Sequence, residues 1–237
     1  MTARFLEISV ASDDLLASLD FYHTLGFTEL TTGDALDYGY AVVAGPQISI
    51  GLHAQHVERP TVTLVLPDLA HTALQWSDNE FVQNMRIDQD TFNQVDLVDH
   101  DDHALRLIEA RTFSPSSEKI SMALPGRLLE YTLPVRDALA SAQFWAPWTQ
   151  QSLGVQEEPK LHMRLEMAGL PVGLSEVATG RVPRLSYAVD DIAALGMALD
   201  HLGAPLKPCG IGLRGCAGRL VSPEGLEFAF FQEDFLD

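Results

Sequence analysis

Glu7 and Glu130 are acidic residues that interrupt two stretches otherwise typical of buried β-strands. Glu7 lies between Leu6 and Ile8 in FLEISV, and Glu130 lies in the similar stretch LLEYTLPV. A carboxylate in such a place can bind a metal ion, take a proton as a general base, or pair with a cation. It can also face water, since alternate side chains of a strand point to opposite faces. The residues around the two acids have to decide among these interpretations.

The two acids occupy equivalent places in an internal repeat. FLEISVASDDLLASLDFY aligns with LLEYTLPVRDALASAQFW, so that Glu7 and Glu130 are 123 positions apart. The same separation relates TLVLPDLAHTAL to SYAVDDIAALGM, and LVDHDDHALRLIEA to LVSPEGLEFAFFQE. A repeat of this length indicates two similar domains. We predict a first domain at 1–112, a linker at 113–126 and a second domain at 127–237.

Each half divides once more into a strand, a helix and three strands. In the first unit Leu6, Ile8 and Val10 alternate with more polar residues, which is the period of a strand with two different faces. Asp13 or Asp14 is placed to cap the following helix, and Gly26 to end it. Three further stretches, LGFTEL, DYGYAVVAG and QISIGLH, read as strands separated by turns. The whole chain therefore predicts four βαβββ units.

Composition excludes several classes of partner. The chain has 237 residues, of which 46% are hydrophobic, and a formal net charge of −18. Such a surface repels nucleic acid. No stretch approaches the roughly 18 apolar residues of a membrane span, and the first residues lack a secretion signal. We expect a cytoplasmic protein with no nucleic-acid or membrane partner.

Cys209 and Cys216 are the two cysteines of the sequence. Two thiols cannot build a disulfide framework or a four-cysteine zinc site. The sequence favours two reduced thiols.

Several of these motifs resemble the vicinal oxygen chelate superfamily, which includes glyoxalase I, bleomycin resistance proteins and extradiol dioxygenases. The resemblance is carried by SDDLLASLDFYHTLGF, by RDALASAQFW with SLGV, and by LVDHDDHALRLIEA and LVSPEGLEFAFF. It implies an α+β fold of four βαβββ modules in two tandem domains, with cup-shaped mixed β-sheets and helices outside. It also implies that a ligand binds inside a cup.

The same resemblance implies eight positions for metal ligands, and this chain fills only two of them with acids, Glu7 and Glu130. The other six positions hold residues that are not the His, Gln or Glu ligands of the family. Four of them are Thr61, Arg184, Arg106 and Ala229. The last two are Gly51 and Gly173 or, if counted two residues earlier, Ser49 and Pro171. We therefore expect no metal and no cofactor.

Arginine at two of these positions suggests ion pairs in place of metal. If the units pair within each half, Glu7 shares a cup with Arg106, and Glu130 shares a cup with Arg184. A guanidinium can neutralise a desolvated carboxylate through two parallel hydrogen bonds. His53 lies on the same side of its strand as the cup-facing positions Ser49 and Gly51, because it follows them at steps of two residues. It is the best candidate in the first cup for moving a proton. The predicted ligand-binding residues are Glu7, His53, Arg106, Glu130 and Arg184.

Other chemically suggestive residues have simpler explanations. HDDH, at 100–103, falls where the family has an exposed turn, so we expect a solvated turn. His56 falls in a loop with no expected role. Five aromatic residues could stack on a ligand: Tyr38, Tyr40, Trp76, Trp145 and Trp148. Of these, we expect Trp145 in the core, because it aligns with Tyr22 on a helix.

The missing ligands predict a metal-independent small-molecule-binding protein of the glyoxalase/bleomycin-resistance type, which sequesters an organic compound in a β-sheet cup. The alternative is a metal-dependent lyase, isomerase or dioxygenase with a nonstandard site, for instance Glu7 with His53. The repeat leaves open which units share a cup, and whether the protein is a monomer or a homodimer.

Overall fold

The computed structural model describes residues 3–32, 36–45, 47–76, 78–87, 93–109, 126–157, 160–176, 182–209 and 215–233. The predicted linker 113–126 lies outside these ranges apart from Gly126.

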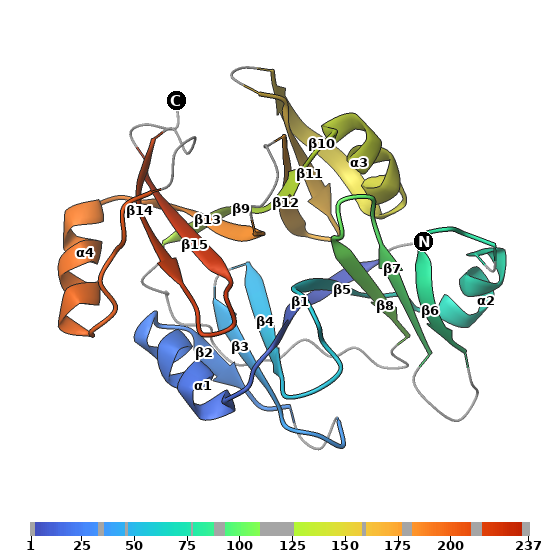
Figure 1. Cartoon of the computed structure of the whole chain (residues 1–237), viewed down its shortest axis with the longest axis horizontal. Helices are drawn as coiled ribbons and strands as arrows, with labels where there is room; N and C mark the ends of the chain where they lie inside the picture. Colours follow the sequence, from blue (N-terminus) through green and yellow to red (C-terminus); the bar gives the residue numbers. More distant parts are fainter. Residues whose placement is uncertain are drawn as a thin grey trace.

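The described strands of the first half form one eight-stranded mixed sheet (Figure 1). Its strands, in spatial order, are β2 (Thr28–Leu30), β3 (Tyr40–Gly45), β4 (Ile48–His53), β1 (Arg4–Ala11), β5 (Thr61–Val65), β8 (Ala104–Ile108), β7 (Gln94–Val98) and β6 (Val82–Arg86).

The described strands of the second half form a separate seven-stranded sheet. Its order is β10 (Thr149–Gln156), β11 (His162–Met167), β12 (Leu170–Glu176), β9 (Arg127–Val135), β13 (Arg184–Val189), β15 (Glu227–Gln232) and β14 (Cys216–Val221).

The central strand pairs settle how the units combine. β1 runs antiparallel to β5 and parallel to β4, and β5 runs parallel to β8. The second half repeats this pattern with β9, β13, β12 and β15. Each sheet thus joins the two units of its own half, one of the arrangements that the repeat had left open.

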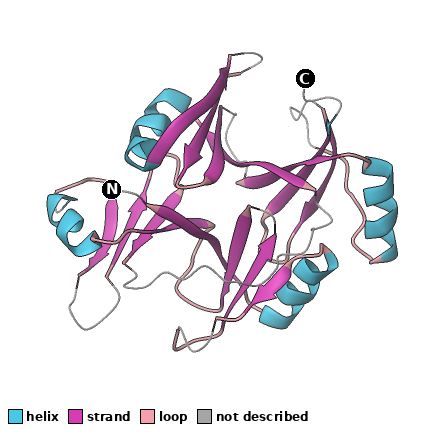
Figure 2. Cartoon of the chain, turned by 180° about the vertical axis from the view of Figure 1, so that it is seen from behind, coloured by secondary structure: helices cyan, strands magenta, loops and turns pink. Residues whose placement is uncertain are grey.

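Helices lie at the periphery of the sheets, as Figure 2 shows, and the prediction of an α+β fold with helices outside is confirmed. Asp14, Asp137 and Asp191 accept hydrogen bonds from backbone N–H groups in the first turns of α1, α3 and α4, which stabilises the helix starts. The helical segments are α1 (Leu15–Thr24), α2 (Leu69–Ala73), η1 (Leu74–Trp76), α3 (Ala138–Trp145), η2 (Ala146–Trp148) and α4 (Ile192–His201).

The fourth unit differs from the prediction of three strands after the helix. Its described part contains β14 and β15, preceded by an isolated bridge between Lys207 and Arg219. Lys207 lies beside Pro208, which has no backbone N–H to continue a ladder, and Pro205 lies shortly before it. These prolines explain why the bridge does not extend into a strand.

Aromatic side chains join the two halves. Tyr22 of α1 packs near Phe228 of β15 with ring centroids 6.2 Å apart, and its hydroxyl donates to Glu224. On the opposite side, Trp76 and Trp148 meet edge to face at 5.4 Å. The first unit thus packs against the fourth, and the second unit against the third, so the halves share one apolar core.

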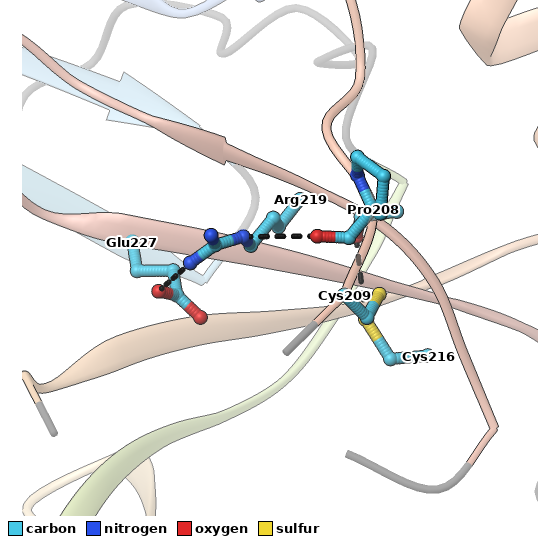
Figure 3. Close-up of a disulfide and its surroundings, with 6 residues drawn as sticks. Pro208, Cys209, Cys216, Arg219 and Glu227 are labelled. Carbon is cyan, nitrogen blue, oxygen red and sulfur yellow. Dashed lines mark hydrogen bonds and ion pairs between the residues drawn. A yellow bond between two sulfur atoms is a disulfide. The ribbon is translucent and has the colours of Figure 1, made fainter. Parts of the chain in front are cut away.

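The expectation of two reduced thiols is wrong in this structure, because Cys209 and Cys216 form a disulfide (Figure 3). The bridge between Lys207 and Arg219 brings the two segments together, with Cα atoms of the cysteines 6.0 Å apart, inside the range that a disulfide spans. Arg219 reinforces this end of the sheet by donating to the carbonyl of Pro208 and to Glu227.

Among the described residues, no helix is long and apolar enough to cross a membrane.

Candidate functional site

Glu7 is buried in the middle of the first sheet, with 2% of its surface exposed. Its strand β1 lies between β4 and β5, where Glu7 is opposite Thr63. The possibility that Glu7 faces water is therefore excluded. A buried carboxylate needs hydrogen-bond donors or cations to offset the loss of water.

Three side chains supply those donors. Ser9 donates to Oε1 of Glu7 at 2.7 Å, and Tyr40 donates to Oε2 at 2.7 Å. His53 places Nε2 2.8 Å from Oε1. Both carboxylate oxygens are therefore occupied, and the charge is balanced by local hydrogen bonds.

Gly51 provides the space that the carboxylate fills. It pairs with Ser9 across β4 and β1, and a Cβ atom built on it would lie 2.1 Å from Oε1 of Glu7. Any larger residue at this position would collide with the acid. The resemblance implies a metal ligand at position 51, but the space beside Gly51 is filled by the side chain of Glu7.

His53 connects Glu7 to a second hydroxyl group. Its Nδ1 lies 3.0 Å from the hydroxyl oxygen of Tyr38, while the imidazole itself is buried. The half-buried ring of Tyr38 packs edge to face on His56, with centroids 5.0 Å apart. Burial raises the pKa of Tyr38, the charge of Arg106 opposes this rise, and Glu7 and Asp37 add to it.

The predicted ion pair between Glu7 and Arg106 is wrong. Arg106 donates from Nε to Asp96 at 2.7 Å and from Nη2 to the carbonyl of His56 at 3.1 Å. Asp96 is directly opposite Arg106 on the neighbouring strand β7, whereas Glu7 lies two strands away, beyond β5. The nearer acid therefore takes the guanidinium.

A cavity of about 700 Å³ lies over the outer strands of the first sheet. Arg106, Thr61 and His56 line it, together with the aromatic side chain of Phe81 and several acids that include Asp96. Arg106 and Thr61 occupy two of the cup-facing positions that the resemblance implies. His56 links the cavity to the Glu7 network, because it lines the cavity and its ring meets that of Tyr38, which does not line the cavity itself.

The second half contains a related network around Glu130. Thr132 donates to Oε1 at 2.7 Å, and Oε2 lies 3.0 Å from Nε2 of His162 and 3.2 Å from Nε of Arg164. Gly173 is the equivalent of Gly51, since its Cβ would lie 2.3 Å from Oε1 of Glu130.

Electrostatics keep Glu130 ionised. Burial acts to raise the pKa of Glu130, but the hydrogen bond and charge of His162, the hydroxyl of Thr132 and the charge of Arg164 outweigh it. The pKa therefore lies below its ordinary value. Arg184, the partner predicted for Glu130, is buried on β13 opposite Thr132, and the prediction missed the basic side chains of His162 and Arg164.

The Glu7 network does not fit a metal centre. Both oxygens of Glu7 already accept hydrogen bonds, and Nε2 of His53 points at one of them. Over the described ranges, no group of three His, Cys, Asp or Glu side chains is placed to hold a metal ion. The donor set consists instead of hydroxyl groups and a single imidazole.

The HDDH segment is not the fully solvated turn that the sequence suggested. His103 is buried, and its ring nitrogen Nε2 lies 2.8 Å from the carbonyl oxygen of Pro134 in the other half. Asp99, just before the segment, is also buried and accepts from the backbone N–H groups of Asp101 and His103. This turn therefore helps to join the halves.

Sequence reasoning missed Tyr40 and Asp96 as partners of the predicted site residues. Tyr40 is opposite His53 in the antiparallel pair of β3 and β4. A correct prediction of the register of this hairpin would therefore have placed Tyr40 beside Glu7. Trp145 is in the core as expected, with 1% of its surface exposed.

No family model matches the chain, and neither does any curated protein.

Structural comparison is informative over nearly the whole chain. A catechol 2,3-dioxygenase matches with a TM-score of 0.55 at 12% identity, covering 97% of this chain and 87% of that one. A variant of homoprotocatechuate 2,3-dioxygenase from Brevibacterium fuscum gives a TM-score of 0.63 at 11% identity, with coverage of 96% and 70%. The corresponding enzyme from Arthrobacter globiformis gives 0.62 at 12% identity, with coverage of 97% and 79%. The chain therefore has the fold of the extradiol dioxygenases, which are vicinal oxygen chelate proteins.

Proposed function

We propose that this protein binds a small organic molecule in the cavity of its first half and does so without a metal ion. The cavity beside the closed Glu7 network carries this proposal. A volume of about 700 Å³ lies within the range of small-molecule sites. The fold alone does not assign a function, since one fold supports many chemistries.

The cavity lining indicates the chemistry of the ligand. Phe81 is partly exposed and offers apolar contact, and Arg106 offers a guanidinium whose Nε and Nη2 are already held. Carboxylates also line the cavity, and the net charge of the chain is −18. A neutral or cationic molecule with an aromatic or other apolar part suits this environment better than a polyanion.

A screen of small organic compounds by thermal shift tests the proposal. Hits should stabilise the native protein and lose this effect in Asn84→Trp, because Asn84 lines the cavity. Gln151→Trp is the matched control, since Gln151 also sits on an exposed strand and donates to an acid of the next strand. Stabilisation that survives Asn84→Trp would place the ligand elsewhere.

A metal-dependent lyase, isomerase or dioxygenase is the second candidate, favoured by the fold shared with dioxygenases. Elemental analysis of protein purified without chelators distinguishes this metal-dependent enzyme from the metal-independent binding protein. Stoichiometric Fe, Mn, Ni or Zn would overturn the metal-independent proposal.

A further inference from the structure

We propose that Arg106 binds the oxygen of an uncharged carbonyl group, such as that of an aromatic amide, in the cavity of the first half. Arg106 lines this cavity and is held from two sides. Its Nε donates to Oδ1 of Asp96 at 2.7 Å, and its Nη2 donates to the carbonyl of His56 at 3.1 Å. This inference rests on the proposed binding function and names the ligand class of the same site.

The guanidinium of Arg106 keeps hydrogen-bond donors for a ligand. A guanidinium carries five N–H groups and has no acceptor. Within the described ranges, Nη1 makes no hydrogen bond, although only 16% of the side chain is exposed. A donor that is held in place before binding loses little conformational freedom when an acceptor arrives. The N–H groups of Nη1 therefore suit an oxygen atom with free lone pairs, as in a carbonyl group.

Asp96 fixes the orientation of Arg106 within a hydrogen-bonded cluster of the cavity lining. Its Oδ2 accepts from Nε2 of Gln94 at 2.7 Å and from Nδ2 of Asn84 at 3.3 Å, while Oδ1 accepts from Arg106. All four residues line the cavity. The amide groups hold the carboxylate, and the carboxylate holds the guanidinium through a charge-assisted hydrogen bond. Asp96 therefore acts as a positioning residue.

The charges around Arg106 favour a neutral ligand over an anion. Asp96 compensates the charge of the guanidinium at 2.7 Å. The lining also contains further carboxylates and arginines: Glu58, Glu80, Asp99, Asp102, Arg59 and Arg86. Acids thus outnumber arginines around the cavity. This excess repels a carboxylate, whereas a carbonyl oxygen accepts a hydrogen bond without bringing a net charge.

An aromatic pair lies in the same lining and suits the apolar part of the ligand. The rings of Phe81 and His100 meet edge to face with centroids 4.8 Å apart, and both residues line the cavity. Phe81 is only partly buried. An aromatic ring packs well against such a surface. The ligand class is therefore an aromatic molecule with an uncharged carbonyl group.

The second half does not repeat this arrangement. Arg106 is opposite Asp96 in the pair of β8 and β7, whereas the corresponding pair of β15 and β14 places Ala229 opposite Arg219. Ala229 is buried, and its methyl side chain cannot donate a hydrogen bond. The carbonyl site, formed by Arg106 and Asp96, therefore belongs to the half that carries the cavity.

Three probes with the same aromatic ring test the ligand class. Benzamide is neutral and has a carbonyl group, benzoate has a similar shape and a negative charge at pH 7, and benzylamine is a cation without a carbonyl group. Ligand-observed NMR titration of the full chain at pH 7 gives the dissociation constants. We expect the wild type to bind benzamide about tenfold more tightly than benzoate, and more tightly than benzylamine.

The variants locate the effect. Asp96→Asn removes the charge that compensates Arg106, so the preference for benzamide over benzoate should fall about tenfold. Arg106→Lys removes the planar fork, and benzamide binding should weaken about tenfold. Glu227→Gln is the matched control and should keep the wild-type preference. Glu227 pairs with Arg219 at 3.1 Å, is similarly shielded with 14% of its side chain exposed, and is not part of the cavity lining.

The outcomes separate the carbonyl site from the binding function. Circular dichroism checks the fold of each variant, and the wild-type preference together with Arg106→Lys decides the test if Asp96→Asn does not fold. Tighter binding of benzoate or benzylamine than of benzamide, an unchanged preference in Asp96→Asn, or undiminished benzamide binding in Arg106→Lys would overturn the carbonyl site. Absence of binding by all three probes would overturn the ligand class, whereas failure of the compound screen as well would overturn the binding function.

Discussion

Gly51 lies against the carboxylate of Glu7 so closely that a Cβ atom at Gly51 would stand 2.1 Å from Oε1. Gly173 has the same relationship to Glu130, at 2.3 Å. Neither glycine has the positive φ that would require glycine for backbone reasons. Both are therefore explained by the volume of the acid that each accommodates.

Gly51→Ala should destabilise the protein by about 1 to 3 kcal/mol, because the added methyl group must displace a buried, hydrogen-bonded carboxylate. Urea unfolding measures the loss. Gly196→Ala is the matched control: its new Cβ would meet only Leu206 Cδ1 at 3.9 Å, and alanine favours the helix α4. A Gly51→Ala protein as stable as the wild type would contradict the close contact.

Removing the acid should remove the clash. In a double-mutant cycle, Gly51→Ala should cost much less in a Glu7→Ala background than in the wild type, because the methyl group then enters vacated space. Unfolding free energies of the four proteins give the coupling. Additive effects would show that Gly51 is required for another reason.

Glu130 should make the protein sensitive to acid. Its pKa is lower in the folded state than in the unfolded chain, where a glutamate titrates at about 4.3. The stabilisation is therefore complete above that unfolded value and is lost as the pH falls through the lower folded pKa. The stability advantage of the wild type over Glu130→Gln should shrink between pH 7 and pH 3 in urea unfolding. An advantage independent of pH would contradict the assignment.

The disulfide should contribute to stability. The Cys209–Cys216 bond closes a short loop, and loop-closure entropy predicts about 2 to 3 kcal/mol. Replacing both cysteines by serine should lower the free energy of unfolding by that order, and thiol titration of the denatured, unreduced protein should find no free thiol. Two titratable thiols would restore the expectation from sequence.

The two halves should unfold together. Phe228 is fully buried and contacts Phe21, Tyr22 and Phe27 of the first half. Phe228→Ala should therefore cost about 3 to 5 kcal/mol and lower one common transition. Leu202→Ala is the control, because Leu202 is more than half exposed. Two separate transitions in calorimetry would show that the halves are independent.

The repeat made the fold predictable, and strand periodicity made much of the site predictable. Alternation in FLEISV placed Glu7 on the face opposite Leu6, Ile8 and Val10, and the family resemblance placed that face inside a cup. The parity of ISIGLH placed His53 on the cup-facing side of its own strand, and the two residues now form a hydrogen bond.

Partners from other strands could not be predicted in this way. Arg106 had two acids within plausible reach, and choosing Asp96 over Glu7 required the order of the strands in the sheet. The disulfide depended on the bridge between Lys207 and Arg219, which no periodicity indicates. The burial of His103 required the packing of one half on the other.

The imidazole that contacts each buried acid comes from β4 in one half and from β11, the counterpart of β3, in the other. The acid and its glycine are present in both halves, whereas the basic partner comes from different strands. Each copy thus neutralises its own charge with its own neighbours. The same buried acid can therefore be balanced from either of two neighbouring strands of this fold.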